Sequence, residues 1–283
     1  MTGDPSPTTQ VALGPIDRQH LADARRWIHR DASLTDRILG GVSDNSRQLI
    51  DAVLDRSGAR RTMQRVAAEL LDNFEPVVSG GPPAAMTPQM EPEQRARALA
   101  HADRDADQIA SRYIGGLSVQ GAATGAASVN PLAAIAAVAA DVTITTLGLL
   151  RASSEIISTY IHRDDLREAS IATVLLAGEQ DVDTRRRGLL ITAGIEPAAQ
   201  PSEDRLAAIL AEQAGPRLVN EAMESLVRRR VRQRALAAVP LFGAALGAAT
   251  SAWMVERACT VARHVGRLSA IHADVTLERT VLD

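Results

Sequence analysis

Residues 113–140 read YIGGLSVQGAATGAASVNPLAAIAAVAA, and no side chain in this stretch carries a formal charge. Almost every residue is small, and the block GAATGAAS at residues 121–128 recurs as GAALGAAT at residues 243–250. The second copy lies inside another uncharged run, residues 235–255. Small residues at fourfold spacing let two helix backbones approach closely, so we expect the two stretches to pack together as helices. The glycines expected at this contact are Gly121, Gly125, Gly243 and Gly247.

The composition predicts an all-α protein. Of the 283 residues, 46% are apolar but only 2% are aromatic, so Ala, Leu, Val and Ile must fill the core. Ala is the best helix former, and alternating β-branched and aromatic residues, the mark of strands, are nearly absent. We therefore expect a multi-helix bundle built around two Ala/Gly-rich helical hairpins.

Proline and glycine divide the chain into sections. Residues 1–15 read as a disordered tail without the pattern of a secretory signal, and residues 16–74 as short N-terminal helices that begin with an amphipathic one. A Pro/Gly-rich linker is expected at residues 75–93. The main helical domain follows at residues 94–272, and a C-terminal tail at residues 273–283.

Two long helices are expected inside the main domain. Pro131 suits the first position of a helix that runs to about residue 161, and Pro240 precedes one that runs to about residue 272. Asp141 lies in the first of them, and a carboxylate at the centre of a bilayer-spanning helix costs about 2.5–3.5 kcal/mol. The sequence therefore predicts that the first helix spans a membrane poorly by itself. The second uncharged run, residues 235–255, is just long enough to cross a bilayer, but Pro240, Gly243 and Gly247 disfavour a span.

Aligning the two repeated blocks places Asp141 and Arg263 at the same position of the repeat, each twenty residues after its first glycine. A lone buried carboxylate is costly, so we hypothesise that Asp141 is neutralised by Arg263 or by Arg257. The alternative is that the repeat is a chance similarity in an Ala-rich chain.

The segment HADRDAD at residues 101–107 places His101 and Asp105, and likewise Asp103 and Asp107, four residues apart on a polar helix, a spacing that could hold a divalent metal. The two pairs lie on different helix faces, and Arg104 interrupts them. A solvated charged face is the favoured interpretation, and we expect no metal or other cofactor.

A second charged feature is RRRVRQR at residues 228–234, which ends where the second uncharged run begins. A basic cluster beside an apolar segment suits anionic lipid headgroups, at about 1 kcal/mol per Arg. The alternative is a solvated helix whose arginines pair with acidic residues such as those at 101–107. The candidate contact residues are Arg228, Arg229, Arg230, Arg232 and Arg234.

The remaining chemistry points away from an enzyme. The net charge is −3, no aromatic residue is interleaved with the basic cluster, and nucleic-acid binding is therefore disfavoured. The chain has no lysine, and its one cysteine, Cys259, lies on an apolar helical pattern that favours a packed thiol over a nucleophile. None of the histidines falls in a catalytic motif. They are His20, His29, His101, His162, His264 and His272.

Several segments together resemble the EcsC family of bacterial proteins. They are a Trp-bearing first helix (ARRWIHRDASLTDRILGGV), a Gly-rich turn (GGLSVQGAATGAAS) with a long helix after it, and a late Pro-Gly segment (AVPLFGAALGAATS). The resemblance covers residues 16–272. It implies an α-helical protein on the cytoplasmic side of the membrane, associated in its namesake with an ABC transporter operon linked to secretion. It carries no catalytic residue to this sequence.

Two functions are compatible with these features. The first is a non-catalytic, peripherally membrane-associated protein at the inner face of the cell membrane, with an anionic membrane surface or a membrane protein as its partner. The second is a soluble helical interaction module whose Ala/Gly-rich segments are only its core. A homo-oligomer is compatible with either.

Overall fold

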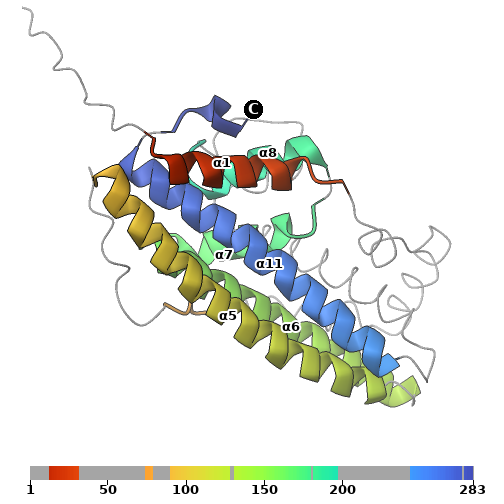
Figure 1. Ribbon diagram of the computed structural model, residues 1–283. Helices are drawn as coiled ribbons and strands as arrows, with labels where there is room; N and C mark the ends of the chain where they lie inside the picture. Colours follow the sequence, from red (N-terminus) through yellow and green to blue (C-terminus); the bar gives the residue numbers. More distant parts are fainter. Residues whose placement is uncertain are drawn as a thin grey trace, which may run out of the picture.

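The computed structural model describes residues 13–31, 74–78, 90–127, 131–179, 181–196, 243–275 and 277–282 (Figure 1). Within its helices, the side chains at 124–127, 131–142, 243–247, 274 and 279 lie outside the description. The described part contains six α-helices and one short 3-10 helix and has no strand, so the all-α prediction is confirmed.

Three long helices form the centre of the molecule: α5 (Pro92–Ala127), α6 (Pro131–Tyr160) and α11 (Gly243–Asp274). Each packs against the other two. Helices α5 and α6 form a hairpin, and α11 lies beside both of them over much of their length (Figure 1). The ion pairs Asp103–Arg267 and Asp107–Arg263 fix the register of α5 against α11. One sequence number rises as the other falls, so the two helices are antiparallel.

The predicted bounds of α6 and the predicted end of α11 are confirmed, but the expected break in α5 is not. Helix α6 runs from Pro131 to Tyr160, as expected, and α11 ends at Asp274, close to the predicted residue 272. The expected Gly-rich turn after Tyr113 is wrong, because α5 continues through it to Ala127. An added Cβ at Gly115 or Gly116 would meet no other atom within 4 Å. Neither glycine breaks the helix, since glycine only lowers helix propensity.

Shorter elements cover the three long helices. Helix α7 (Leu166–Leu176) packs on α6 and α11, and α8 (Val182–Thr192) packs on α7. The Asp181 side chain accepts a hydrogen bond from the Thr184 backbone N–H at 2.8 Å, which caps α8. The sequence pattern also predicts two short helices here, at residues 166–176 and 183–194, and α7 and α8 match them to within two residues.

Helix α1 (Pro15–Ile28) lies across α11 and is joined to α5 by a fully buried ion pair (Figure 1). Arg95 donates from Nε and Nη2 to the two carboxylate oxygens of Asp17, at 3.1 and 2.6 Å. Asp17 also accepts from the backbone N–H of Gly14 at 2.7 Å. This amphipathic helix is therefore part of the same core as the long helices.

The C-terminal end also packs on α1. The 3-10 helix η1 (Arg279–Leu282) contacts α1, and Arg25 donates to the Val281 carbonyl at 2.8 Å. Leu282 is 0% exposed. The predicted C-terminal tail is thus anchored on the first helix over residues 277–282.

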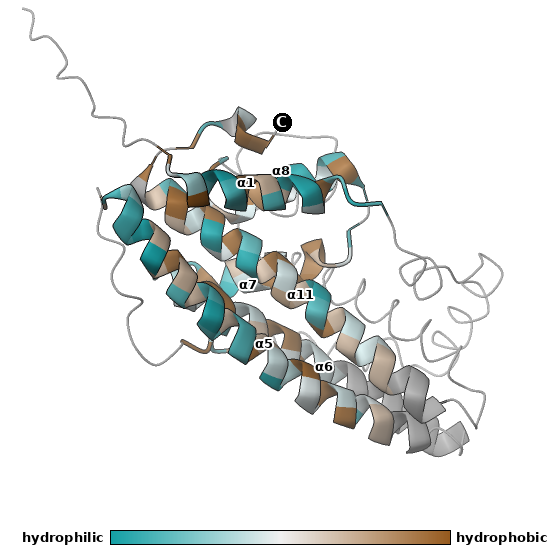
Figure 2. Cartoon of the chain, viewed as in Figure 1, coloured by the Kyte–Doolittle hydropathy of each residue, from teal (hydrophilic) through white to brown (hydrophobic). Residues whose placement is uncertain are grey.

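Charge is distributed unevenly along the long helices (Figure 2). Their apolar ends gather at one end of the bundle, and the charged halves of α5 and α11 meet α1 at the other. We call the first the apolar end and the second the charged end. The apolar end comprises residues 113–127 and 243–255, which are uncharged, and residues 131–150, whose one charged residue is Asp141. Among the described residues, no helix is both long and apolar enough to cross a membrane.

Candidate functional site

A ladder of charged side chains joins α5 to α11 at the charged end. The Arg263 guanidinium lies 2.6 Å from Asp107, and Arg267 Nε donates to Asp103 Oδ1 at 2.8 Å. Tyr160 of α6 donates its hydroxyl to the same Asp103 oxygen at 2.6 Å. Acids four apart on one helix face arginines four apart on an antiparallel helix, because this spacing keeps both pairs on the contacting faces.

Two histidines are buried beside this ladder. His20 Nε2 lies 3.9 Å from Asp103 Oδ2, beyond hydrogen-bond distance, and neither ring nitrogen of His20 has a partner. Burial lowers the pKa of His20 and brings that of His264 to about 3. Both rings are therefore neutral at pH 7.

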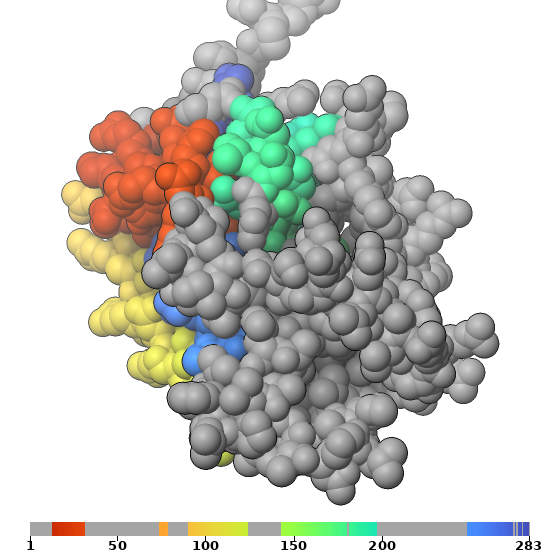
Figure 3. Space-filling view, turned by 90° about the vertical axis from the view of Figure 1, so that its right-hand side faces the viewer, coloured from red at the N-terminus to blue at the C-terminus, as the bar shows by residue number. Residues whose placement is uncertain are grey.

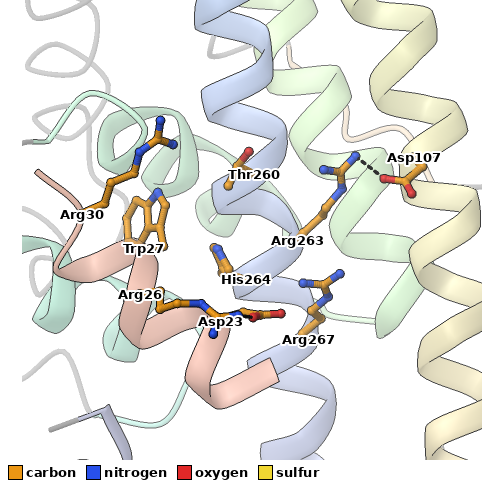
Figure 4. A pocket seen from close by; sticks show the side chains of 9 residues that line it. All are labelled: Asp23, Arg26, Trp27, Arg30, Asp107, Thr260, Arg263, His264 and Arg267. Atoms are coloured by element: carbon orange, nitrogen blue, oxygen red, sulfur yellow. Dashed lines mark hydrogen bonds and ion pairs between the residues drawn. The ribbon is translucent and has the colours of Figure 1, made fainter. Parts of the chain in front are cut away.

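A cavity of about 350 Å³ opens between α1, α5 and α11 (Figure 4). Helix α11 contributes one face of its surface to the wall, because its four lining residues follow the i, i+3, i+4, i+7 pattern of a helix. The full lining is Asp23, Arg26, Trp27, Arg30, Asp107, Thr260, Arg263, His264 and Arg267.

Trp27 is held at the cavity wall from two sides. The His264 ring lies with its centroid 5.7 Å from that of Trp27, and the Arg185 guanidinium lies 5.8 Å from the Trp27 ring centroid. Arg185, from α8, also donates to the backbone carbonyls of Trp27 at 2.9 Å and Arg30 at 3.2 Å. These bonds fix the end of α1 against α8, and the two helices lie side by side at the surface in Figure 3.

The predicted glycine contact is only partly described. Both repeated blocks lie in α5 and α11, which pack against each other, and the ion-pair register places Gly121 and Gly125 opposite the beginning of α11. Gly121 is buried. The surroundings of Gly125, Gly243 and Gly247 lie outside the description, so a direct contact between the glycines stays a prediction.

The predicted ion pair of Asp141 also stays a prediction, because its side chain is not described. Its two candidate partners have other contacts. Arg263 pairs with Asp107, and Arg257 donates from Nε to the Ala177 carbonyl at 2.7 Å and stacks on Trp253 at 5.1 Å from the ring centroid.

The charged segment at residues 101–107 is a solvated face only in part. His101 and Asp105 form an exposed pair at 3.5 Å, in line with the prediction. The prediction of a solvated face is wrong for Asp103, because that carboxylate is only 24% exposed and binds Arg267 and Tyr160. The described residues contain no cluster of three or more potential metal ligands. The basic cluster at residues 228–234 lies outside the described residues.

Cys259 is 1% exposed, and burial raises the pKa of its thiol to about 12. A thiol that stays protonated at pH 7 is a poor nucleophile. The geometry favours the packed thiol that the sequence pattern indicated.

Sequence reasoning missed the cavity. The sequence pattern placed Trp27 on the first amphipathic helix and His264 among six histidines, and it gave no role to Arg30 or Arg267. The available signal was the matched spacing of Asp103 with Asp107 and of Arg263 with Arg267. Two such pairs predict an antiparallel ladder, but they do not predict which third helix closes a cavity over it.

Comparison with known proteins finds no matching family model, no matching curated protein and no matching solved structure. The EcsC resemblance is therefore carried by the quoted segments alone.

Proposed function

We propose that the protein is a non-catalytic helical protein of EcsC-like type that docks peripherally on an anionic membrane surface through its apolar end. The observation that carries this proposal is the exposure of two large hydrophobic side chains, Val119 on α5 and Ile144 on α6. They are 72% and 48% exposed, respectively. An apolar surface of this kind on a water-soluble bundle marks an interaction site when it is contiguous.

The two residues lie at the same level of the bundle. An added Cβ at Gly148 of α6 would lie 2.6 Å from Leu117 of α5, and Arg112 pairs with Glu155 further along, which sets the register of the hairpin. In that register Val119 lies level with a point two to four residues from Ile144, or roughly 3–6 Å of helix rise. Both therefore belong to one part of the apolar end.

The basic cluster at residues 228–234 lies shortly before α11 in the sequence. Arg234 precedes Gly243, the first residue of α11, by nine positions. An extended chain of nine residues spans no more than roughly 30 Å. In this proposal the arginines of the cluster at residues 228–234 contact anionic headgroups on the cytoplasmic side. The EcsC resemblance adds a link to transport or secretion.

A second candidate is the soluble interaction module. It is favoured by the packing of Gly148 against Leu117 and by the burial of Thr145 and Thr146, which are 2% and 3% exposed. These contacts show that the apolar end contributes to the core. In this alternative Val119 and Ile144 meet a protein partner in place of a bilayer.

Vesicle sedimentation separates the two candidates. The full chain should sediment with vesicles of phosphatidylcholine and phosphatidylglycerol, and much less with phosphatidylcholine alone. Replacing Val119→Ser together with Ile144→Thr should weaken binding, as should Arg228→Gln, Arg230→Gln and Arg232→Gln combined.

The matched control is Val78→Ser, because Val78 is a 56% exposed hydrophobic residue outside the apolar end. This variant should sediment like the wild type. Failure of the wild-type protein to bind anionic vesicles at low salt would reject the membrane proposal and favour the soluble module.

A further inference from the structure

The cavity at the charged end has a positively charged wall. Four guanidinium groups line it against two carboxylates, which leaves two positive charges in excess while His264 is neutral. Three of the arginines have a carboxylate partner each. Arg26 pairs with Asp23, Arg263 with Asp107, and Arg267 with Asp103, which stands behind the wall.

Arg30 differs from these three. Its side chain is exposed, and no carboxylate of the described residues lies within ion-pair distance of its guanidinium. Its backbone is nevertheless held in place, since its carbonyl accepts from Arg185 at 3.2 Å. Figure 4 shows Arg30 beside Trp27, across the cavity from Arg263. A cationic group without a partner on a fixed backbone is available to an anion that enters the cavity.

The buried wall also holds polar groups that the protein does not satisfy. His264 is 6% exposed, and its Nδ1 has no hydrogen-bond partner; Arg263 Nε has none either. Native proteins keep few such groups, because each costs about 1–3 kcal/mol. These two nitrogens belong to adjacent residues of α11 that both line the cavity. Small rearrangements around a bound anion would give them an oxygen partner.

From this arrangement we infer that the cavity between α1, α5 and α11 binds the phosphate group of a small, soluble phosphate monoester. Arginine is the side chain best suited to phosphate, because its planar fork of N–H donors matches two phosphate oxygens. A phosphate monoester carries a charge of about −1.5 to −2 at pH 7. The Arg30 guanidinium offsets about one unit of this charge, since the other three arginines already pair with Asp23, Asp107 and Asp103.

The size and position of the cavity narrow the ligand further. A volume of about 350 Å³ lies in the range of small-molecule sites and leaves room for an organic group on the phosphate, beside the partly buried Trp27 ring. The cavity is formed with α1 at the charged end, and the apolar end lies at the other end of the same helices. This separation favours a soluble ligand over a lipid headgroup.

Isothermal titration of the full chain with phenyl phosphate tests the inference, with inorganic phosphate, sulfate and acetate as comparison anions. We expect phenyl phosphate to bind more tightly than inorganic phosphate and acetate to bind weakest. Arg30→Gln should weaken phenyl phosphate binding about tenfold, the loss of one charge-assisted hydrogen bond. The fold should persist, because the Arg30 guanidinium has no ion-pair partner in the described protein to lose.

The matched control is Arg18→Gln, which removes the same charge from an exposed position of α1 outside the cavity. It should bind phenyl phosphate like the wild type. A second variant, His264→Phe, should weaken binding while keeping the ring volume.

Three outcomes would overturn the inference: no heat of binding for any phosphate, an equal loss in the Arg30 and Arg18 variants, or equal affinity for all four anions. Binding of phosphatidic acid vesicles that depends on Arg30, without binding of phenyl phosphate, would reject the soluble ligand and assign the cavity to a lipid headgroup. The site is independent of the proposed membrane contact, because Val119→Ser with Ile144→Thr should leave phenyl phosphate binding unchanged.

Discussion

The two ends of α11 are held against α5 by different kinds of contact. At the charged end, ion pairs and hydrogen bonds join Arg263 and Arg267 to α5, and the buried Asp17–Arg95 pair attaches α1 to the same helix. At the apolar end the residues are small and uncharged. Ion pairs need defined geometry, whereas small apolar side chains pack in many registers, so the charged end fixes the alignment of the helices.

Breaking the buried pair should have the largest effect of the variants considered. Asp17→Asn leaves the 0% exposed Arg95 without its carboxylate, and removing one partner of a buried ion pair costs about 3–5 kcal/mol. Urea unfolding should show this loss. The exposed Arg97–Glu93 pair on α5 provides the control, and Arg97→Gln should leave the urea midpoint unchanged. Equal effects of both substitutions would mean that the charged end does not fix α1.

The buried His264 makes the charged end sensitive to pH. Its pKa is about 3 in the folded protein, mainly because of burial, against about 6.5 for an ordinary histidine. Below pH 6.5 the unfolded chain therefore binds more protons, and stability falls as the pH falls, by about 2 kcal/mol between pH 7 and pH 5. His264→Phe should remove this part of the slope in urea unfolding at the two pH values.

The exposed His101 supplies the control for this measurement, and His101→Gln should keep the wild-type slope. Part of the slope should persist in the His264 variant, because burial lowers the pKa of His20 in the same direction. An unaltered slope after His264→Phe would contradict a neutral buried ring.

Alanine substitutions at two glycines in helix contacts compare how tightly the two ends are packed. A Cβ at Gly266 would lie 2.5 Å from the Tyr160 ring, whose hydroxyl is bonded to Asp103, so the ring cannot easily move. Overpacking of this kind costs about 1–3 kcal/mol, and Gly266→Ala should lower stability by about 2 kcal/mol. A Cβ at Gly148 would meet Leu117 Cδ1 at 2.6 Å, the flexible end of a side chain.

We therefore expect Gly148→Ala to cost less than Gly266→Ala. Thermal unfolding of both variants provides the comparison. The reverse order would show that the apolar end is the more rigidly packed of the two.

The smallest expected effect is a gain in stability. Gly115 lies inside α5, and a Cβ there would meet nothing within 4 Å. Gly115→Ala should therefore raise the free energy of unfolding by about 0.5–1 kcal/mol through helix propensity alone. A loss of stability would instead indicate that α5 bends or ends at this position, as the sequence had suggested.

The sequence predicted what depends on local pattern. The bounds of α6, α7 and α8 follow from periodic apolar residues and from Pro131 at a helix start. The break predicted at Gly115 was wrong because glycine weakens a helix only slightly, and the packing of α5 against α6 and α11 outweighs this cost.

The candidate site was predictable only in fragments. The spacing of Asp103 with Asp107 was interpreted as a feature of one helix. Of the two matching arginines, Arg263 was assigned to Asp141 and Arg267 was given no role. Nothing in the local pattern shows that Arg267 lies 2.8 Å from Asp103, because the two residues are 164 positions apart.

By itself, the amino-acid sequence determined that this protein is helical, that its long helices have a charged and an uncharged half, and that small residues recur where α5 and α11 lie together. These properties come from propensity and periodicity within single segments. The tertiary structure alone decided which charges pair, which histidines are buried, and that α1 closes an arginine-lined cavity over α11. Those properties depend on contacts between distant segments, where burial and charge act together on groups that no single stretch of sequence contains.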